Sequence, residues 1–170
     1  TAKDPSAVVQ QISSGTIEVI KHPDGGRMIL FGTGKYMESA DVSNMQVQSF
    51  YGIRDTDVNA TYTRANLQAQ TILAQSSSGG FAWRQTSDAA VDYATKKGWY
   101  MDMKFGTANG EKIVYKPITR GTRVIFTTLI PSTAVCDAGG TSWLMEIDAI
   151  NGARLTESPF DVNGDGRFTS

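Results

Sequence analysis

The stretch TIEVIKHPDGGRMILFGT at residues 16–33 has the pattern of two short strands joined by a turn. Its two ends are short runs rich in β-branched and large apolar residues, and the HPDGG cluster between them consists of residues that favour tight turns. This pattern predicts an antiparallel β-hairpin. The apolar residues from Met28 to Phe31 are consecutive, which favours a strand covered on both faces, and stacked sheets would supply that cover.

The same pattern recurs along the chain and makes strands the dominant prediction. One short helix is expected at 86–97, where Ser87 or Asp88 could cap a run with helical spacing. About eight short strands could form a sandwich, a barrel or roughly four propeller blades, and periodicity does not choose among them. Beyond the first hairpin, the turn clusters SSSGG, GTANG and AING help to delimit expected strands at 47–53, 68–75, 98–105, 112–116, 123–130 and 142–148.

The composition, with 40% hydrophobic and 19% charged residues, is that of one globular domain spanning residues 1–170. A net charge of −1 without any Lys/Arg block predicts no nucleic-acid partner. The apolar runs are far shorter than the roughly 20 residues of a membrane-spanning helix. Because the chain opens on Thr1 and stops inside an Asp/Gly-rich loop, we expect a fragment. The single cysteine, Cys136, cannot form an internal disulfide; a spectator thiol is favoured over a partner outside this segment.

The closing stretch FDVNGDGRFTS carries the clearest chemical motif. Asp161, Asn163 and Asp165 occupy alternate positions before Gly166, which matches the first half of the twelve-residue calcium loop. Calcium prefers hard oxygen ligands, and alternate side chains on a tightly turning backbone can converge on one ion. The alternative is an ordinary surface turn rich in Asp and Asn.

The calcium interpretation assigns residues 161–170 as the loop. The Arg167 carbonyl would face inward at the seventh position, and Thr169 would stand ninth, as a ligand directly or through water. An acid at position twelve would lie two residues past Ser170.

Other polar motifs predict structure rather than chemistry. FGTGK at 31–35 lacks the glycine spacing of a phosphate loop and is expected to be a glycine-bent strand end. The only histidine, His22, lies in a turn signature, which disfavours catalysis. Glu146 and Asp148 could form a carboxylate pair, but Asp148 is expected to bind the amides of the following turn. The large aromatics are expected to pack in the core, with a ligand platform as the alternative: Trp83, Trp99, Tyr100 and Trp143.

An ordered set of motifs from about Arg27 to Gly166 resembles the C-terminal domain of the PilC/PilY type IV pilus-associated adhesins. The motifs are MILFGTGKYM at 28–37, QSFYGIRD at 48–55, KKGWYMDMK at 96–104, the stretch at 123–155 that contains FTTLIP and MEIDAINGARL, and FDVNGDG at 160–166.

This resemblance implies an all-β, modified β-propeller with at most one short helix, of which the chain would hold several blades of antiparallel strands. It implies a secreted, non-enzymatic protein at the bacterial surface, associated with the outer membrane or the pilus tip. Its partners would be minor pilins, the pilus machinery and a host-cell or abiotic surface. It would promote pilus extension, twitching motility and attachment under the control of Ca²⁺ held at Asp161, Asn163, Asp165 and the Arg167 carbonyl.

One position departs from the family, whose loop has a carboxylate ninth where this chain has the uncharged Thr169. Calcium binding is therefore expected to be weaker. Two other functions stay open from the residues. MEIDAINGARL is also similar to repeats of quinone-dependent dehydrogenases. A carbohydrate-binding β-domain could stack sugars on Trp83, Trp99 and Trp143.

Overall fold

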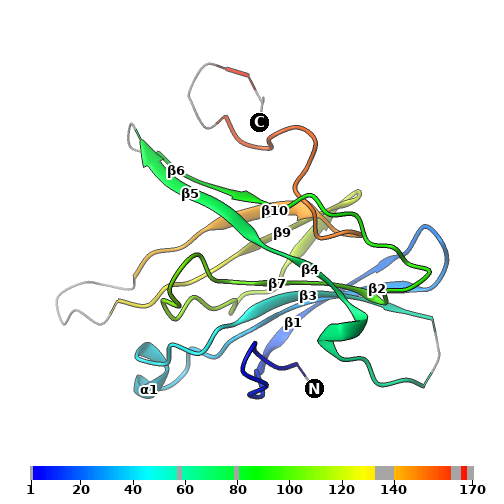
Figure 1. Ribbon diagram of the computed structural model, residues 1–170. Coiled ribbons are helices and arrows are strands. Elements are labelled where there is room, and N and C mark those ends of the chain that lie inside the picture. Colours follow the sequence, from blue (N-terminus) through cyan, green and yellow to red (C-terminus); the bar gives the residue numbers. More distant parts are fainter. Residues whose placement is uncertain (1, 57–58, 79–80, 133–139, 162–165, 168–170) are drawn as a thin grey trace.

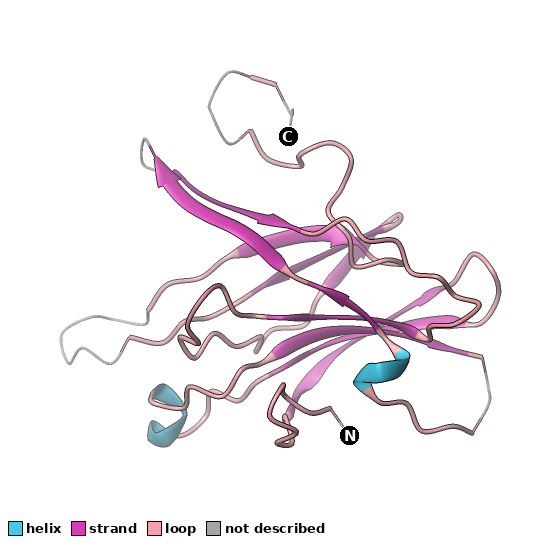
Figure 2. Ribbon diagram, viewed as in Figure 1, coloured by secondary structure: helices cyan, strands magenta, loops and turns pink. Residues whose placement is uncertain are grey.

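Strands dominate the structure, which is a computed structural model (Figure 1, Figure 2). It describes residues 2–56, 59–78, 81–132, 140–161 and 166–167. Its helical segments are α1 (Ser39–Val42) and the 3-10 turn η1 (Arg64–Asn66). The all-β prediction is confirmed. Each of these described helices is about one turn long and is therefore too short to cross a membrane.

The larger sheet is mostly antiparallel and contains the predicted first hairpin. In that hairpin Val19 lies opposite Ile29, and Ile17 lies opposite Phe31. From one edge to the other its strands are β1 (Ile12–Lys21), β2 (Arg27–Thr33), β3 (Ser49–Asp55), β7 (Gly98–Asp102) and β4 (Gln68–Gln70). Only the edge strand β4 is parallel to its neighbour in this described sheet.

Two smaller antiparallel units complete the strands that the structure describes. One sheet consists, from edge to edge, of β10 (Leu144–Asp148), β9 (Arg123–Thr127) and β8 (Ile118–Arg120). The other unit is the hairpin of β5 (Ile72–Ser78) and β6 (Phe81–Thr86). Only Thr71 separates β4 from β5, so one extended segment leaves the large sheet and enters the hairpin, which runs away from both sheets (Figure 1).

The hydrophobic core lies between the two sheets, as the stacked-sheet prediction requires. Phe50 of β3 is at its centre, with its ring stacked on Phe126 of β9 at 4.1 Å and on Trp99 of β7 at 5.7 Å between centroids. Trp99 is completely buried, and its Nε1 donates to the Ala149 carbonyl at 3.2 Å. Further buried side chains from both sheets are Met28, Leu30, Met101, Val124, Met145 and Ile147.

The helix predicted at 86–97 is wrong. The backbone groups that a helix would satisfy internally are used in tertiary contacts: Asn151 Oδ1 accepts the Val91 N–H at 2.9 Å, and Gln70 Nε2 donates to the Ala89 carbonyl at 2.6 Å. Asp92 instead ends the segment in a tight turn, because its carboxylate accepts the Ala94 N–H at 3.0 Å. Tertiary contacts thus override the weak local helical preference of this stretch.

The strand predicted at 112–116 is also wrong. Lys112 makes only an isolated bridge with Leu129, and its buried ammonium donates to the Asn44 carbonyl at 2.9 Å. Burial lowers the pKa of Lys112. Pro117 follows and has no N–H to extend a ladder. The structure adds β6 and β8, which the sequence did not predict, and it divides 68–75 between β4 and β5.

The glycines of FGTG mark a bent strand end, as predicted. A Cβ on Gly32 would lie 2.3 Å from the Ile113 side chain, and a Cβ on Gly34 would lie 2.7 Å from that of Lys112. Gly34 also has a φ of +130°, which residues with side chains rarely adopt. These glycines therefore allow close backbone packing.

His22 is part of the turn between β1 and β2, as the sequence indicated. Its side chain is buried, its Nδ1 accepts the Asp24 N–H at 3.1 Å, and its ring lies edge-on to Tyr93 at 4.4 Å. Burial lowers the pKa of the imidazole, with the Arg54 cation acting in the same direction and Asp24 in the opposite one.

This buried histidine is expected to make the protein less stable in mild acid. Below about pH 6.5, the unfolded chain binds a proton that the folded imidazole resists, so the free energy of unfolding falls with decreasing pH. The slope is at most about 1.4 kcal/mol per pH unit, and it ends once the pH is below the depressed folded pKa. His22→Asn retains an acceptor for Asp24 and cannot titrate. Urea unfolding across this range should show a steeper acid loss in the unsubstituted chain; identical slopes would contradict the assignment.

Candidate calcium loop and buried polar contacts

The predicted calcium loop lies in the tail that follows β10. After the turn at 149–152, the chain leaves the smaller sheet and reaches the C-terminal end at the top of Figure 1. Asp161, Gly166 and Arg167 belong to the described residues. Asn163, Asp165 and Thr169 lie outside them, so their role as ligands stays a prediction, and Cys136 lies outside them as well.

The described part of the loop fits the motif. Asp161 Oδ2 accepts the Gly166 N–H at 2.9 Å, which brings the first and sixth positions together. Gly166 has a φ of +76°, a conformation that suits glycine and supplies the sharp bend. Among the described residues there is no cluster of three or more His, Cys, Asp or Glu side chains suited to a metal. Binding of a cation at the loop would therefore require the tail residues Asn163, Asp165 and Thr169 in addition to Asp161.

The two acids of β10 have structural roles. Asp148 Oδ1 accepts the N–H groups of Ile150 at 3.0 Å and Asn151 at 2.6 Å, which confirms the predicted turn cap. Glu146 forms an ion pair with Arg123 on the neighbouring strand at 3.0 Å. Both carboxylates thus have partners that account for them without a catalytic pair.

A buried ion pair fixes the β5–β6 hairpin to the body, and sequence analysis missed it. Arg84 of β6 donates from Nη1 and Nη2 to the two oxygens of Glu111 at 2.7 and 3.0 Å. The side chains are only 2% and 1% exposed. The Arg84 guanidinium also lies over the Trp143 ring at 4.2 Å and donates to Gln75 of β5 at 2.8 Å. We call this arrangement the hairpin anchor.

A second polar network lies on the outer side of the large sheet. Arg64 of η1 donates to both oxygens of Asp102, at 2.7 and 2.9 Å, and to the hydroxyls of Ser49 and Tyr51. Burial is the largest single influence and acts to lower the pKa of Arg64, but the hydrogen bonds and charge of Asp102, together with Tyr51, outweigh it and raise that pKa. The guanidinium also lies 4.3 Å from the Tyr100 ring centroid. This network joins η1 to the sheet.

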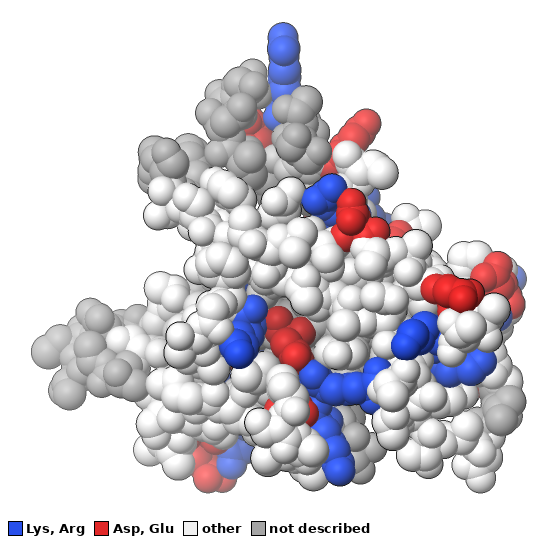
Figure 3. Space-filling model, in the orientation of Figure 1, with Lys and Arg blue, Asp and Glu red and all other residues white. Residues whose placement is uncertain are grey.

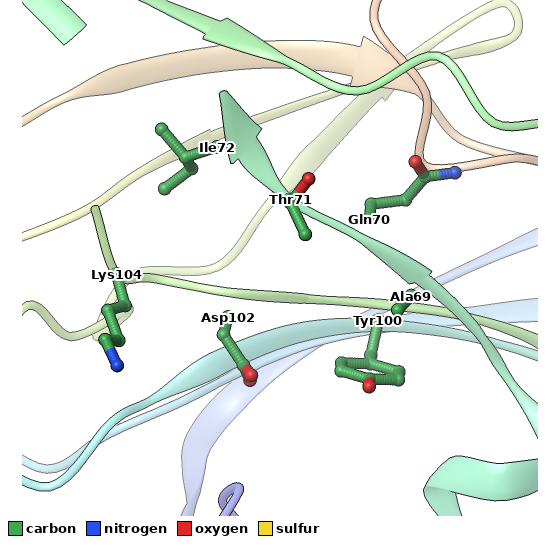
Figure 4. A pocket seen from close by; sticks show the side chains of 7 residues that line it. All are labelled: Ala69, Gln70, Thr71, Ile72, Tyr100, Asp102 and Lys104. Carbon is green, nitrogen blue, oxygen red and sulfur yellow. The ribbon is translucent and has the colours of Figure 1, made fainter. Parts of the chain in front are cut away.

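A hollow of about 200 Å³ lies beside this network, between the β4–β5 segment and the end of β7. Figure 4 shows Tyr100, Asp102 and Lys104 on one side of it and Thr71 and Ile72 on the other. The Asp102 carboxylate is occupied by Arg64 and Ser49. On the face shown in Figure 3, the described Lys/Arg and Asp/Glu side chains are intermingled, with no broad area of one sign.

The tryptophans behave mainly as packing residues. Trp99 has no exposed surface, so it cannot stack on a sugar, and the carbohydrate platform predicted as an alternative loses one of its three rings. Trp143 packs against the core and beneath Arg84. Trp83 of β6 is half-buried.

These features define an all-β module of small stacked sheets, with the sequence motif predicted to bind calcium in its tail. Residues 1–85 match the family model described as the PilY1 beta-propeller domain. The chain therefore belongs to the PilY1 β-propeller family, which confirms the predicted resemblance and fold class.

Relatives extend the similarity over most of the chain. A Type IV pilus biogenesis factor PilY1 homolog of Xylella fastidiosa is 33% identical over 89% of this chain. The Type IV pilus biogenesis factor PilY1 of Pseudomonas aeruginosa is 31% identical over 98% of it. The chain spans only 10% and 16% of their respective lengths. The crystal structure of the P. aeruginosa PilY1 C-terminal domain superposes with a TM-score of 0.85 at 28% identity, over 98% of this chain and 36% of that one.

Proposed function

We propose that this chain is part of a type IV pilus biogenesis factor that acts at the bacterial surface, at the outer membrane or the pilus tip. Its activity in pilus extension, twitching motility and attachment would respond to calcium. Its partners would be minor pilins, the pilus machinery and the colonised surface. Membership of the PilY1 family supports the pilus role, since relatives over most of the chain are biogenesis factors.

The hydrogen bond between Asp161 and Gly166 is the observation that supports calcium binding in this proposal. It brings together two motif positions that must be close in a calcium loop. Asp161, Asn163 and Asp165 would offer side-chain oxygens, and the Arg167 carbonyl and Thr169 would stand at the seventh and ninth positions of the motif. Bound Ca²⁺ would supply the charge that offsets repulsion among these carboxylates. The loop would then have one ordered form in calcium and another ensemble without it.

Calcium is expected to raise the melting temperature of the 170-residue chain, and Asp161→Ala is expected to remove the rise. At a concentration of about 100 times Kd, a single site adds about 2.7 kcal/mol, which corresponds to roughly 5–10 °C for a chain of this size. Glu157→Gln, at an exposed acid in the same tail, is the matched control and should keep the response. Differential scanning calorimetry with calcium and with magnesium measures both variants.

The result that would overturn calcium binding is an unchanged melting temperature together with no heat of binding in titration calorimetry. Calcium control of the pilus role is tested separately in bacteria that carry Asp161→Ala in the full-length protein. Fewer surface pili and a smaller twitching zone are expected, with Glu157→Gln unaffected. Normal piliation and twitching in the Asp161→Ala strain would contradict calcium control of these activities.

A further inference from the structure

Two Asn-Gly pairs of the described residues lie in opposite surroundings. Asn109–Gly110 follows the irregular segment after β7, and Asn151–Gly152 lies in the turn after β10. A third pair, Asn163–Gly164, is outside the described residues. We propose that Asn109 is a site of spontaneous deamidation, with water as the only co-reactant, and that the fold protects Asn151.

The reaction begins when the glycine backbone nitrogen, after loss of its proton to solvent, attacks the asparagine Cγ. The new N–Cγ bond forms as the Cγ–Nδ2 bond breaks, and the side-chain nitrogen leaves as ammonia with a proton from solvent. Water then opens the succinimide ring. Cleavage at Cγ gives aspartate, and cleavage at the α-carbonyl gives isoaspartate, in which the main chain runs through the former side chain.

The surroundings of Asn109 favour this attack. Asn109 is exposed, and its Oδ1 accepts the Glu111 N–H at 3.2 Å. A donor at this oxygen polarises the carbonyl and stabilises the negative charge that develops on it during attack. From Phe105 to Gly110, no backbone N–H donates to a backbone acceptor among the described residues. Local opening that brings water to the buried Gly110 nitrogen therefore breaks few hydrogen bonds.

Each group that must react at Asn151 is held. The Gly152 N–H donates to the Asp148 carbonyl at 2.8 Å. The Val91 N–H at 2.9 Å polarises Asn151 Oδ1 as the Glu111 N–H polarises Asn109 Oδ1, so this contact does not distinguish the two sites. The leaving nitrogen of Asn151, however, donates to Asp148 Oδ1 at 3.2 Å. Attack would require the loss of the bonds to Asp148, together with movement of Gly152, whose Cα lies against the buried Trp99 ring.

Deamidation of Asn109 would act on the hairpin anchor. The product places a carboxylate two residues from Glu111, whose own carboxylate is buried against Arg84. Isoaspartate also lengthens the main chain just before Lys112, whose N–H and carbonyl are both bonded to Leu129 at 2.8 Å. The modified chain is therefore expected to unfold at a lower temperature than the unmodified chain.

The test follows both sites in one protein. The folded 170-residue chain is incubated at mildly alkaline pH, digested with trypsin and analysed by mass spectrometry, where residues 105–112 and 124–154 give separate peptides with one asparagine each. Asn109 is expected to convert at least about tenfold faster than Asn151, since the hydrogen bonds that must break at Asn151 raise the barrier to attack there. Isoaspartyl methyltransferase labelling identifies the isoaspartate product.

A urea-unfolded sample provides the control without any substitution. There the two sites should convert at similar rates, which shows that the fold causes the difference. Equal rates in the folded chain, or faster conversion of Asn151, would overturn the proposal. Asn109→Gln should abolish conversion of the first peptide, and Asn109→Asp should reproduce the lower melting temperature; an unchanged melting temperature in Asn109→Asp would refute the effect on the anchor.

Discussion

Arg84→Ala is expected to lower the free energy of unfolding by about 3–5 kcal/mol, because it leaves the Glu111 carboxylate buried without its counter-ion. The pair is almost completely shielded from water, with both bonds shorter than or equal to 3.0 Å. The substitution also removes the guanidinium from the Trp143 ring and from Gln75. Urea unfolding measures the loss, and hydrogen exchange should locate it first in β5 and β6.

Two control variants separate burial from charge. Arg154→Ala breaks an exposed pair with Asp88 and should cost less than about 1 kcal/mol. Arg84→Met combined with Glu111→Leu removes both charges, and it should be less damaging than Arg84→Ala alone because no uncompensated charge remains. A loss below 1 kcal/mol for Arg84→Ala would show that the hairpin does not depend on this anchor.

Trp99→Ala is the second substitution with a large expected effect, a loss of about 3–5 kcal/mol typical of truncating a buried aromatic residue. Trp99 contributes the ring that stacks on Phe50 and the Nε1–H that donates to Ala149. Its slot is shaped by glycines on both sides: a Cβ on Gly52 would lie 2.4 Å from Nε1, and a Cβ on Gly152 would lie 2.3 Å from the ring. A cavity at this position would open between the two sheets.

The graded control is Trp99→Phe, which keeps an aromatic ring but loses the hydrogen bond, and it should be less destabilising than Trp99→Ala. Trp83→Ala, at a half-buried position on the hairpin, should cost less than the core truncation. Thermal and urea unfolding of the three variants give the ranking. If Trp83→Ala were the most damaging of them, the placement of the core between the two sheets would be wrong.

The main strands could be predicted because their signals are local. Alternating and β-branched residues with turn clusters between them located the first hairpin and the strands β3, β7, β9 and β10. The strands β6 and β8 gave no such signal. β6 contains Arg84 and Gln85, and its place depends on Glu111, a residue 27 positions away from Arg84. Conversely, 112–116 looked like a strand, but its packing is set by the glycine-bent end of β2.

The candidate site was predictable to the extent that it is a contiguous motif. The alternate spacing of Asp161, Asn163 and Asp165 before Gly166 indicated a calcium loop, and this assignment stays a prediction; among the described residues, Asp161 accepts the Gly166 N–H. The Arg64–Asp102 network joins residues 38 positions apart, and no local pattern in the sequence indicates that they pair. The periodicity of the sequence does not show which charged residues are buried. Contacts of this kind can therefore be predicted only once the topology that brings the two residues together is known.

The parallel pairing of β4 with β7 also orders events as the chain is made. β1, β2 and β3 are neighbours both along the polypeptide and in the sheet, so they can pair as soon as they leave the ribosome. β4 emerges earlier than β7 but has no partner in this sheet until β7 follows. The β5–β6 hairpin lies between them in the sequence and can form on its own in the meantime. Such non-local pairings form slowly. Growth of the large sheet during translation should therefore proceed from its β1 edge, with β4 joining last.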